Sequence, residues 1–293
     1  ATTEIYTLSL HDALPILSDV AASDAAYAAV RAAFEEHSVL VFRDQEVSDD
    51  VQLAFSRRFG PPETTKVGSM GTGSHFVILS TFGPDGKVVP SDHRQQLRAK
   101  ANQLWHTDSS FKRVPALTSI LSARIIPEHG GETEFVSMRL AFERLDKDVA
   151  RRLENSFAWH SYAHSRSKVA AGLATTEEVD ALPPVCWRMV WRNPVNGRGA
   201  LYLASHAYGV EGMDADAGKA LIEQLTEAAT APGVSYLHQW KQGDVVMWDN
   251  RATMHRGRPW PAHEGRLMIR TTISATDADG VANMQLPSPQ ATE

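Results

Sequence analysis

The most informative residues of this chain are Trp105-His106-Thr107-Asp108. A second histidine, His255, follows much later in the segment Trp248-Asp249-Asn250-Arg251-Ala252-Thr253-Met254-His255-Arg256. In an extended segment, side chains two residues apart point to the same face, so His106 and Asp108 can bind one metal ion while Thr107 points away. A His-x-Asp pair with a distant histidine is the ligand set of a non-haem iron site that leaves coordination positions open. Packed strands commonly bring such distant segments together. The pattern therefore predicts a metal centre in a strand-rich fold.

The His-x-Asp pair is a weak motif by itself, because 12 histidines make chance pairs common. A surface or capping pair is the alternative. Arg266 and Arg270 follow His255 in an apolar, strand-like run, where an unpaired guanidinium is costly to bury. Bidentate binding of a carboxylate would remove that cost. Two structural ion pairs at a sheet edge would also remove it, and the residues alone leave both explanations open.

The composition is that of one large globular domain. A chain of 293 residues, with 43% hydrophobic and 22% charged residues, is long enough to bury a full core. The net charge of −6 and the absence of a basic run argue against nucleic acid as a partner. No apolar run approaches the roughly 18 residues that span a bilayer, so we expect no membrane partner. A single cysteine, Cys186, suits the cytoplasm, and a homo-oligomer is the assembly we expect.

Residues 1–16 need a separate interpretation. They contain neither a charged n-region nor a small-residue cleavage site, so they make a poor signal peptide. The segment resembles the translation of a sequencing-library adapter, and the alternative is a genuine first strand and turn. We interpret residues 1–16 as non-native, give His11 and Asp12 no role, and expect a single domain over residues 17–293.

Helical spacing, caps and breakers predict the first elements. Apolar residues recur at helical spacing over 23–37, with Ser23 as the N-cap. A short buried strand covers 39–42, and a second helix begins near Ser48 and ends at Gly60-Pro61-Pro62. Residues 63–104 are polar and irregular, which is typical of a long functional or mobile loop.

Short apolar runs separated by turns follow, together with helical stretches near 138–155 and 214–230. They predict a mainly β fold with flanking helices (α+β): a sandwich, barrel or jelly roll. The expected strands are 103–105, 117–123, 133–136, 200–204, 235–239, 245–248 and 267–274.

Longer motifs stand in a fixed order between about residues 20 and 275. They are Phe55-Ser56-Arg57-Arg58-Phe59-Gly60-Pro61, Asn102-Gln103-Leu104-Trp105-His106-Thr107-Asp108-Ser109-Ser110-Phe111, Gly130-Gly131-Glu132-Thr133-Glu134-Phe135, Gly243-Asp244-Val245-Val246-Met247-Trp248-Asp249-Asn250 and His255-Arg256-Gly257-Arg258-Pro259. Together they resemble the taurine / (2,4-dichlorophenoxy)acetate dioxygenase family of iron(II), 2-oxoglutarate-dependent oxygenases. The resemblance implies a double-stranded β-helix (jelly-roll) core.

The resemblance assigns roles to single residues. His106, Asp108 and His255 would bind Fe(II), and Arg266 with the hydroxyl of Thr133 would bind the distal carboxylate of 2-oxoglutarate. This agrees with the chemistry, because an arginine and a hydroxyl donor make a good buried carboxylate receptor. An ordinary β-branched strand residue is the alternative for Thr133. The resemblance further implies that 2-oxoglutarate and O2 are consumed and that succinate and CO2 are formed.

The resemblance also places Arg270 at the anionic end of the substrate, which indicates a small carboxylate or sulfonate. Local motifs are closer to the phenoxyacetate branch than to the taurine branch, so we expect an aryloxyalkanoate-like acid that is cleaved at its ether. Asn102 and His206 are further substrate-binding candidates, and a structural hydrogen bond is the alternative for His206. Lys66 and Lys87 are the last two candidates, with a solvated surface side chain as the alternative for each.

Other functional classes share parts of this pattern. A zinc hydrolase could use the same three ligands around an activated water, but it gives no reason for Arg266 and Thr133. A non-catalytic binding protein of the same fold would have lost a ligand or Arg266, and the sequence keeps them all. A taurine or alkylsulfonate dioxygenase is the alternative within the family.

Overall fold

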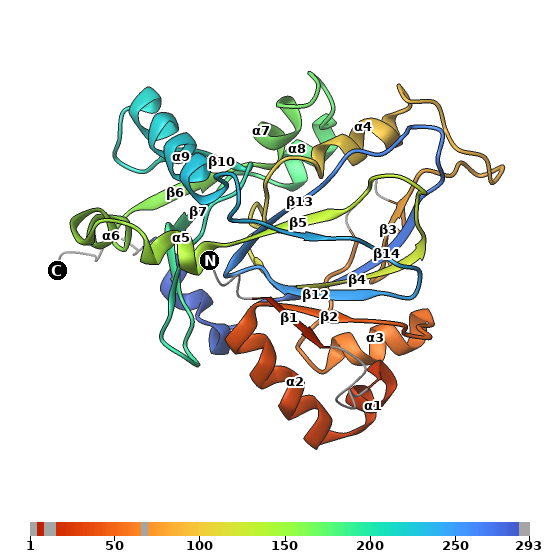
Figure 1. Ribbon diagram of the computed structural model, residues 1–293. Helices are drawn as coiled ribbons and strands as arrows, with labels where there is room; N and C mark the ends of the chain where they lie inside the picture. Colours follow the sequence, from red (N-terminus) through yellow and green to blue (C-terminus); the bar gives the residue numbers. More distant parts are fainter. Residues whose placement is uncertain (1–4, 9–15, 66–69, 287–293) are drawn as a thin grey trace.

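A six-stranded sheet forms the base of the fold. The computed structural model describes residues 5–8, 16–65 and 70–286 (Figure 1). The sheet has the order β1-β2-β12-β4-β14-β3, in which β1 and β2 are parallel and the other neighbours antiparallel. Its strands are β1 (Ile5–Leu8), β2 (Val39–Phe42), β12 (Val245–Asp249), β4 (Ala116–Ile125), β14 (Leu267–Ser274) and β3 (Val77–Ser80).

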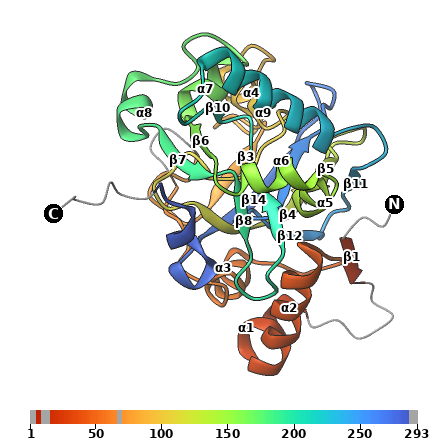
Figure 2. The same cartoon turned by 90° about the vertical axis from the view of Figure 1, so that its left-hand side faces the viewer.

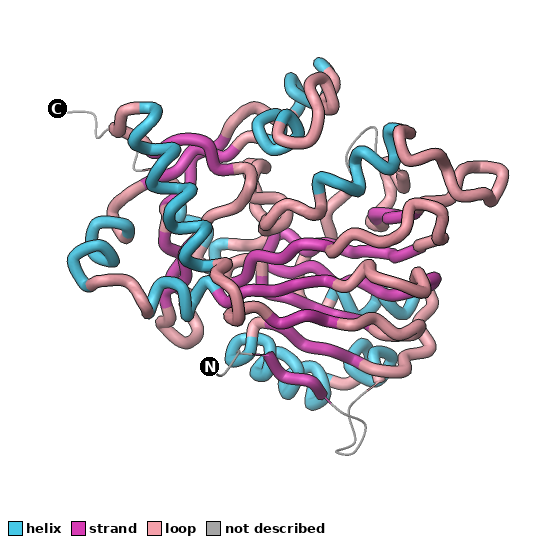
Figure 3. Tube along the Cα trace, turned by 45° about the horizontal axis from the view of Figure 1, so that its top comes forward, coloured by secondary structure: helices cyan, strands magenta, loops and turns pink. Residues whose placement is uncertain are grey.

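A three-stranded antiparallel sheet lies opposite the large one (Figures 1 and 3). It consists of β11 (Tyr236–His238), β5 (Thr133–Ser137) and β13 (Thr253–Gly257), with β5 in the middle. Because alternate strand residues point inward, the Phe135 ring of β5 lies 5.6 Å from the Trp248 ring of β12. The two sheets enclose the site between them. The expected mainly β fold with flanking helices and a jelly-roll core is confirmed.

Three helices cover the outer face of the large sheet: α1 (Leu17–Ala22), α2 (Asp24–His37) and α3 (Asp49–Arg57) (Figure 1). The side chains of Ser23 and Ser48 cap α2 and α3 by accepting from backbone N–H groups of the first turn. Phe34 of α2 and Phe55 of α3 are fully buried, in one cluster with residues of β2 and β12. The two helices and the strand β2 predicted from spacing are therefore confirmed.

A helical layer with two small sheets is inserted between β5 and β11 (Figure 2). The predicted helical stretches near 138–155 and 214–230 are confirmed within it. The elements are α5 (Met138–Glu143), α6 (Lys147–Leu153), β6 (Phe157–His160), α7 (Tyr162–Ser167), α8 (Thr176–Ala181), β7 (Val185–Arg188), β8 (Val190–Arg192), β9 (Gly199–Leu201), β10 (Ala207–Val210) and α9 (Ala215–Ala229). Two short 3-10 helices, Asp277–Asp279 and Val281–Met284, follow β14.

Two expectations about secondary structure are wrong. Residues 63–104 are not one long loop, because they contain the edge strand β3 and the helix α4 (Arg94–Ala101). Residues 103–105 do not form a strand. The chain leaves α4 through turns at Asn102 and Gln103, whose N–H groups bond back to Ala99 and Lys100. It meets β13 through an isolated bridge between His106 and His255 and through the carbonyl of Asn102, which accepts from Gly257 N.

The first residues are described in part. The backbone of Ile5–Leu8 pairs with β2 as the edge strand of the large sheet, whereas His11 and Asp12 lie outside the described residues. The interpretation of residues 1–16 as non-native stays a prediction. Within the described ranges, no helix combines the length and apolar character needed to cross a membrane.

A buried charge network anchors the end of β12. The guanidinium of Arg251 donates to both carboxylate oxygens of Asp249 at 2.9 Å and to Glu35 of α2 at 2.8 Å. These side chains are at most 7% exposed. Burial would raise the pKa of Glu35, but the charge of Arg251, the amide of Asn193 and the charge of Arg31 lower it. Helix α2 is thereby fixed to the segment that contains Asn250.

We predict that Glu35→Gln lowers the free energy of unfolding at pH 7 by about 3 kcal/mol, because it leaves a buried guanidinium partly uncompensated. The folded pKa of Glu35 lies below its ordinary value of 4.5. Its contribution is therefore complete above that pH and is lost as pH falls through the folded pKa. Urea unfolding curves at pH 7 and in acid measure the difference in free energy of unfolding between the wild type and Glu35→Gln. This difference should be smaller in acid.

Glu143→Gln is the matched control, because the carboxylate of Glu143 pairs with Arg198 at 2.8 Å but is 47% exposed. A half-exposed ion pair contributes little, so we expect a loss under about 0.5 kcal/mol. Equal losses in the two variants would contradict the role of the buried network.

Candidate metal centre

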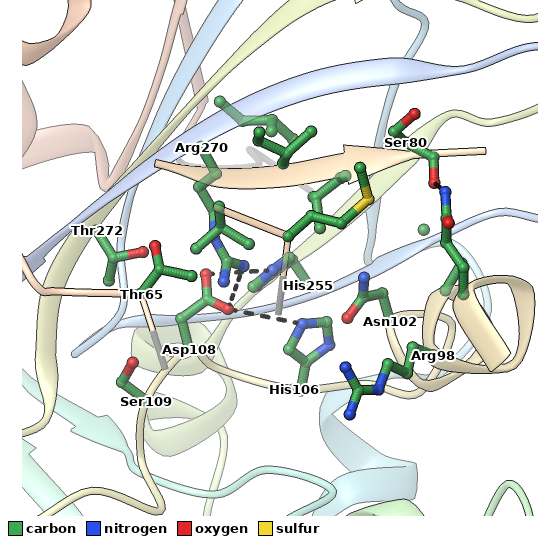
Figure 4. Close-up of a pocket in the computed structure, with 18 of the residues that line it drawn as sticks. Thr65, Ser80, Arg98, Asn102, His106, Asp108, Ser109, His255, Arg270 and Thr272 are labelled. Atoms are coloured by element: carbon green, nitrogen blue, oxygen red, sulfur yellow. Dashed lines mark hydrogen bonds and ion pairs between the residues drawn. The ribbon is translucent and has the colours of Figure 1, made fainter. Parts of the chain in front are cut away.

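Three side chains converge between the two sheets. The candidate ligand atoms of His106, Asp108 and His255 all lie within 4.8 Å of one another (Figure 4). His106 Nε2 is 3.9 Å from Asp108 Oδ1, and His255 Nε2 is 3.8 Å from Asp108 Oδ2. All three residues are buried, at 5–6% exposure. The distances leave room for one ion among the three groups.

The backbone aligns the two histidines. His106 N donates to the carbonyl of His255 at 2.9 Å, and His255 N donates to the carbonyl of His106 at 2.7 Å. Their rings lie 4.1 Å apart between centroids. His106 Nδ1 lies 2.7 Å from the carbonyl of Leu104, so a proton on Nδ1 leaves Nε2 free to bind a metal.

Asp108 is held by a polar clamp of Ser119 and Asn250. Ser119 Oγ donates to Asp108 Oδ2 at 2.7 Å, and Asn250 Nδ2 donates to Ser119 Oγ at 3.1 Å. Asn250 Oδ1 accepts from the backbone N–H of Asp108 at 3.0 Å. Thr107 points away from the centre, as expected, and donates to the carbonyl of Asn250 at 2.7 Å. The carboxylate is therefore fixed through both its side chain and its backbone.

The electrostatics keep the three groups in the state that binds a metal. Burial lowers the pKa of both His106 and His255, so the imidazoles are neutral. Burial would raise the pKa of Asp108, but the charge of Arg270, followed by those of the two histidines, lowers it well below its usual range. Arg270 Nη1 donates to Asp108 Oδ1 at 2.6 Å. A carboxylate and two neutral imidazoles are the forms that coordinate a divalent ion.

Arg266 is a buried cation without a countercharge. It is 8% exposed, its guanidinium makes no ion pair or hydrogen bond with any described residue, and its Nε is buried and unpartnered. It lies 5.0 Å from the centre of the Trp260 ring, and burial lowers its pKa to about 10. Thr133 is 4% exposed, and its hydroxyl accepts from Trp240 Nε1 at 3.0 Å. Such a guanidinium fits an incoming carboxylate.

One cavity of about 380 Å³ joins these groups, within the size range of small-molecule sites. It is lined by the three candidate metal ligands and by Thr133, Arg266, Arg270, Asn102 and His206, which the structure thus brings together. Its apolar wall comes from Val77, Ile78, Leu79, Phe111 and Leu121.

The remaining candidates separate in the structure. Lys87 is exposed in the turn before Val88 and is not among the cavity-lining residues, so the arrangement gives it no contact with a ligand in the cavity. Lys66 lies outside the described residues. His206 is 2% exposed and lies 3.2 Å from Ser110 Oγ through Nδ1, so it lines the cavity and is also tied structurally.

Sequence reasoning missed the residues that hold Asp108. Asn250 stands inside a quoted motif but carried no assigned role, and Ser119 was one polar residue in an apolar strand. The signal for Ser119 was its position in β4, opposite Trp248 of β12. It becomes readable only after the register of the two strands is known.

The comparisons agree with this geometry. The family model described as "Taurine catabolism dioxygenase TauD, TfdA family" matches residues 13–272. The chain is 40% identical over 243 residues, 81% of this chain and 85% of the relative, to the alpha-ketoglutarate-dependent 2,4-dichlorophenoxyacetate dioxygenase of Cupriavidus pinatubonensis. It is 33% identical over 267 residues, 88% of this chain and 90% of the relative, to the (S)-phenoxypropionate/alpha-ketoglutarate-dioxygenase of Sphingobium herbicidovorans.

A solved structure extends the likeness to three dimensions. The crystal structure of AAD-2 in complex with Mn(II) and N-oxalylglycine has a TM-score of 0.83 and 37% identity, covering 94% of this chain and 96% of that one. A taurine dioxygenase from Burkholderia xenovorans has a TM-score of 0.69 at 24% identity, covering 87% and 81%, and shows the shared fold alone. The resemblance read from the motifs is confirmed: this chain belongs to the TauD/TfdA family of dioxygenases.

Proposed function

We propose that this protein is an Fe(II)- and 2-oxoglutarate-dependent dioxygenase that oxidises a small organic anion, an aryloxyalkanoate-like carboxylate, and thereby cleaves its ether. The observation that carries the proposal is Arg266, a buried guanidinium without a countercharge in the part of the chain that the structure describes, in the same cavity as three candidate metal ligands. A zinc hydrolase on the same ligands would have no use for a second, carboxylate-binding part of the site. Family membership supports the dioxygenase.

The residues present fit both groups. The two imidazoles and the carboxylate are the ligand set that non-haem iron takes while keeping open positions. When bound, iron and 2-oxoglutarate supply the oxidising chemistry: O2 is consumed, 2-oxoglutarate gives succinate and CO2, and a substrate C–H bond is hydroxylated. The orphaned guanidinium of Arg266 and the hydroxyl of Thr133 would bind the distal carboxylate of 2-oxoglutarate.

The protein's own part is to bind, orient and keep the site dry. Ser119 and Asn250 fix the direction of the Asp108 carboxylate, and the reciprocal backbone bonds fix the two histidines. Arg270 lies beside Asp108 at the inner end of the cavity, where it would orient the acid group of the substrate. The apolar wall would exclude water around the carbon to be oxidised.

The substrate class follows from this wall. Val77, Ile78 and Leu79 of β3, with Phe111, offer an apolar and aromatic surface that suits an aryl group better than the aminoethyl chain of taurine. Two relatives are named for phenoxyacetate and phenoxypropionate substrates. Hydroxylation of the carbon between carboxylate and ether oxygen gives a hemiacetal, which loses the phenol. Taurine or an alkylsulfonate is the alternative substrate.

The remaining substrate contacts expected from the sequence are proposals. Asn102 and His206 line the cavity and would contact the substrate body, and Lys66 and Lys87 find no support from the described geometry. The cytoplasmic location and the homo-oligomer are predictions from the sequence.

Asp108→Ala should abolish succinate formation, because it removes the one anionic ligand. Ser119→Ala should keep the ligand but weaken Fe(II) binding by about 10–100-fold, since it removes the hydrogen bond that orients the carboxylate. Metal content and succinate yield measure the two effects, with circular dichroism to verify the fold. Full activity of Asp108→Ala would remove Asp108 from the ligand set.

Arg266→Ala should raise the 2-oxoglutarate concentration needed for half-maximal turnover. Losing one partner of a buried charge pair costs about 2–5 kcal/mol, which corresponds to roughly 30-fold or more in binding. Arg266→Lys keeps the positive charge but not the planar, bidentate guanidinium. Its 2-oxoglutarate requirement should therefore lie between those of the wild type and Arg266→Ala. An unchanged 2-oxoglutarate requirement would show that Arg266 binds something else.

A substrate panel tests the chemical class. Phenoxyacetate and both enantiomers of 2-phenoxypropionate should stimulate succinate formation and release phenol in equal amount, because the same oxidation drives ether cleavage. Taurine and pentanesulfonate should stimulate it weakly. Sulfite release with no phenol release would favour the alkylsulfonate alternative.

A further inference from the structure

The cavity contains more basic side chains than 2-oxoglutarate and a substrate with one anionic group need. Among the described residues, six basic side chains other than histidine line it: Arg94, Arg98, Lys112, Arg166, Arg266 and Arg270. Four of them have oxygen partners in the protein: Arg270 with Asp108, Lys112 with Glu63, Arg98 with Glu178, and Arg94 with the carbonyl of Leu173. Arg266 is assigned to 2-oxoglutarate. Arg166 is left over.

Arg166 is held in position without being neutralised. It lies in the last turn of α7, and its guanidinium is 4.6 Å from the centre of the Tyr162 ring. It makes no ion pair or side-chain hydrogen bond with a described residue, and its Nε is buried. The carboxylate of Glu178 accepts from the Tyr162 hydroxyl, from Arg98 at 2.9 Å and from the backbone N–H of Thr175, the N-cap residue of α8. Stacking on Tyr162 therefore orients the guanidinium of Arg166, which has no anionic partner among the described residues.

Arg166 belongs to the outer end of the cavity. An aromatic series leads to it from the metal centre: His106 to His206 at 6.4 Å, His206 to Phe111 at 4.7 Å, and Phe111 to Tyr162 at 5.1 Å. Arg166 stacks on Tyr162 at the far end of this series, whereas Arg270 donates to Asp108 beside the candidate metal centre. Arg270 therefore lies at the inner end and Arg166 farther out.

We propose that Arg166 is a second anion receptor, so that the preferred substrate is a dianion: an aryloxyalkanoate with a further carboxylate on its ring. The inner acid group lies at Arg270, beside the carbon that is oxidised. The aryl body follows Phe111 and Tyr162, and the ring carboxylate takes the fork of Arg166. This inference rests on the proposed function and narrows its substrate.

The test compares two acids that differ only in the outer charge, phenoxyacetate and 4-carboxyphenoxyacetate. The wild-type protein should have the higher kcat/KM for the dianion, measured by succinate formation. In Arg166→Gln the ratio of kcat/KM for dianion over monoanion should fall about 10–100-fold, the effect of one charged hydrogen-bonded contact. Arg166→Lys should retain part of the preference.

Arg94→Gln is the matched control, because Arg94 also lines the cavity but is 48% exposed and bonded to a backbone carbonyl. The ratio of kcat/KM for dianion over monoanion in Arg94→Gln should equal that of the wild-type protein. A wild-type protein without preference for the dianion, or an equal loss for both acids in Arg166→Gln, would overturn the receptor while phenoxyacetate turnover still supports the dioxygenase. Absence of succinate with either acid in the wild type would overturn the proposed function itself.

Discussion

The structure depends on two reciprocal backbone hydrogen bonds, between His106 and His255. They join the segment after α4 to β13, although the two residues are far apart in the sequence and the segment forms no strand. Because the backbone of each histidine both donates and accepts, neither residue can move away from the other without breaking both hydrogen bonds. The two imidazoles are thereby aligned before any metal arrives, and the neighbouring turn brings Asp108 to the third position. The antiparallel sheets around this contact keep it in place.

Burial of charge then explains most of the site. Asp108 is nearly inaccessible, yet the donors Ser119 and Arg270 keep its carboxylate ionised, and Asn250 Nδ2 in turn donates to Ser119 Oγ. Arg266 is the opposite case, a buried cation that no anionic group among the described residues balances. A protein maintains such an imbalance where a ligand removes it, since an unpaired buried charge otherwise costs several kcal/mol. The unpaired guanidinium therefore supports the proposal that an anion binds in the cavity beside the candidate metal centre.

Much of this could be predicted from the sequence, for identifiable reasons. Helix α2, strand β2 and helix α3 carry apolar periodicity and serine caps, so local signals sufficed. The three candidate metal ligands and Thr133 stand in long motifs, whose order carried the assignment, and Arg266 follows the last motif in an apolar, strand-like run.

Other elements depend on contacts that the sequence does not display. Helix α4 is rich in Arg, Gln and Lys and has no apolar stripe; it is stabilised by Gln95, which donates to the carbonyls of Ser80 and Phe82. Ser119 and Arg166 become meaningful only after strands and helices far apart in the sequence are packed together.

The central claim is that three protein ligands and Arg266 form one two-part site for iron and an oxoacid. The most direct measurement is anaerobic addition of Fe(II) and 2-oxoglutarate, followed by visible absorption spectroscopy. The account predicts a weak charge-transfer band that requires both components and is absent with Fe(II) alone. No band at saturating concentrations, together with tightly retained zinc and hydrolytic activity, would contradict it.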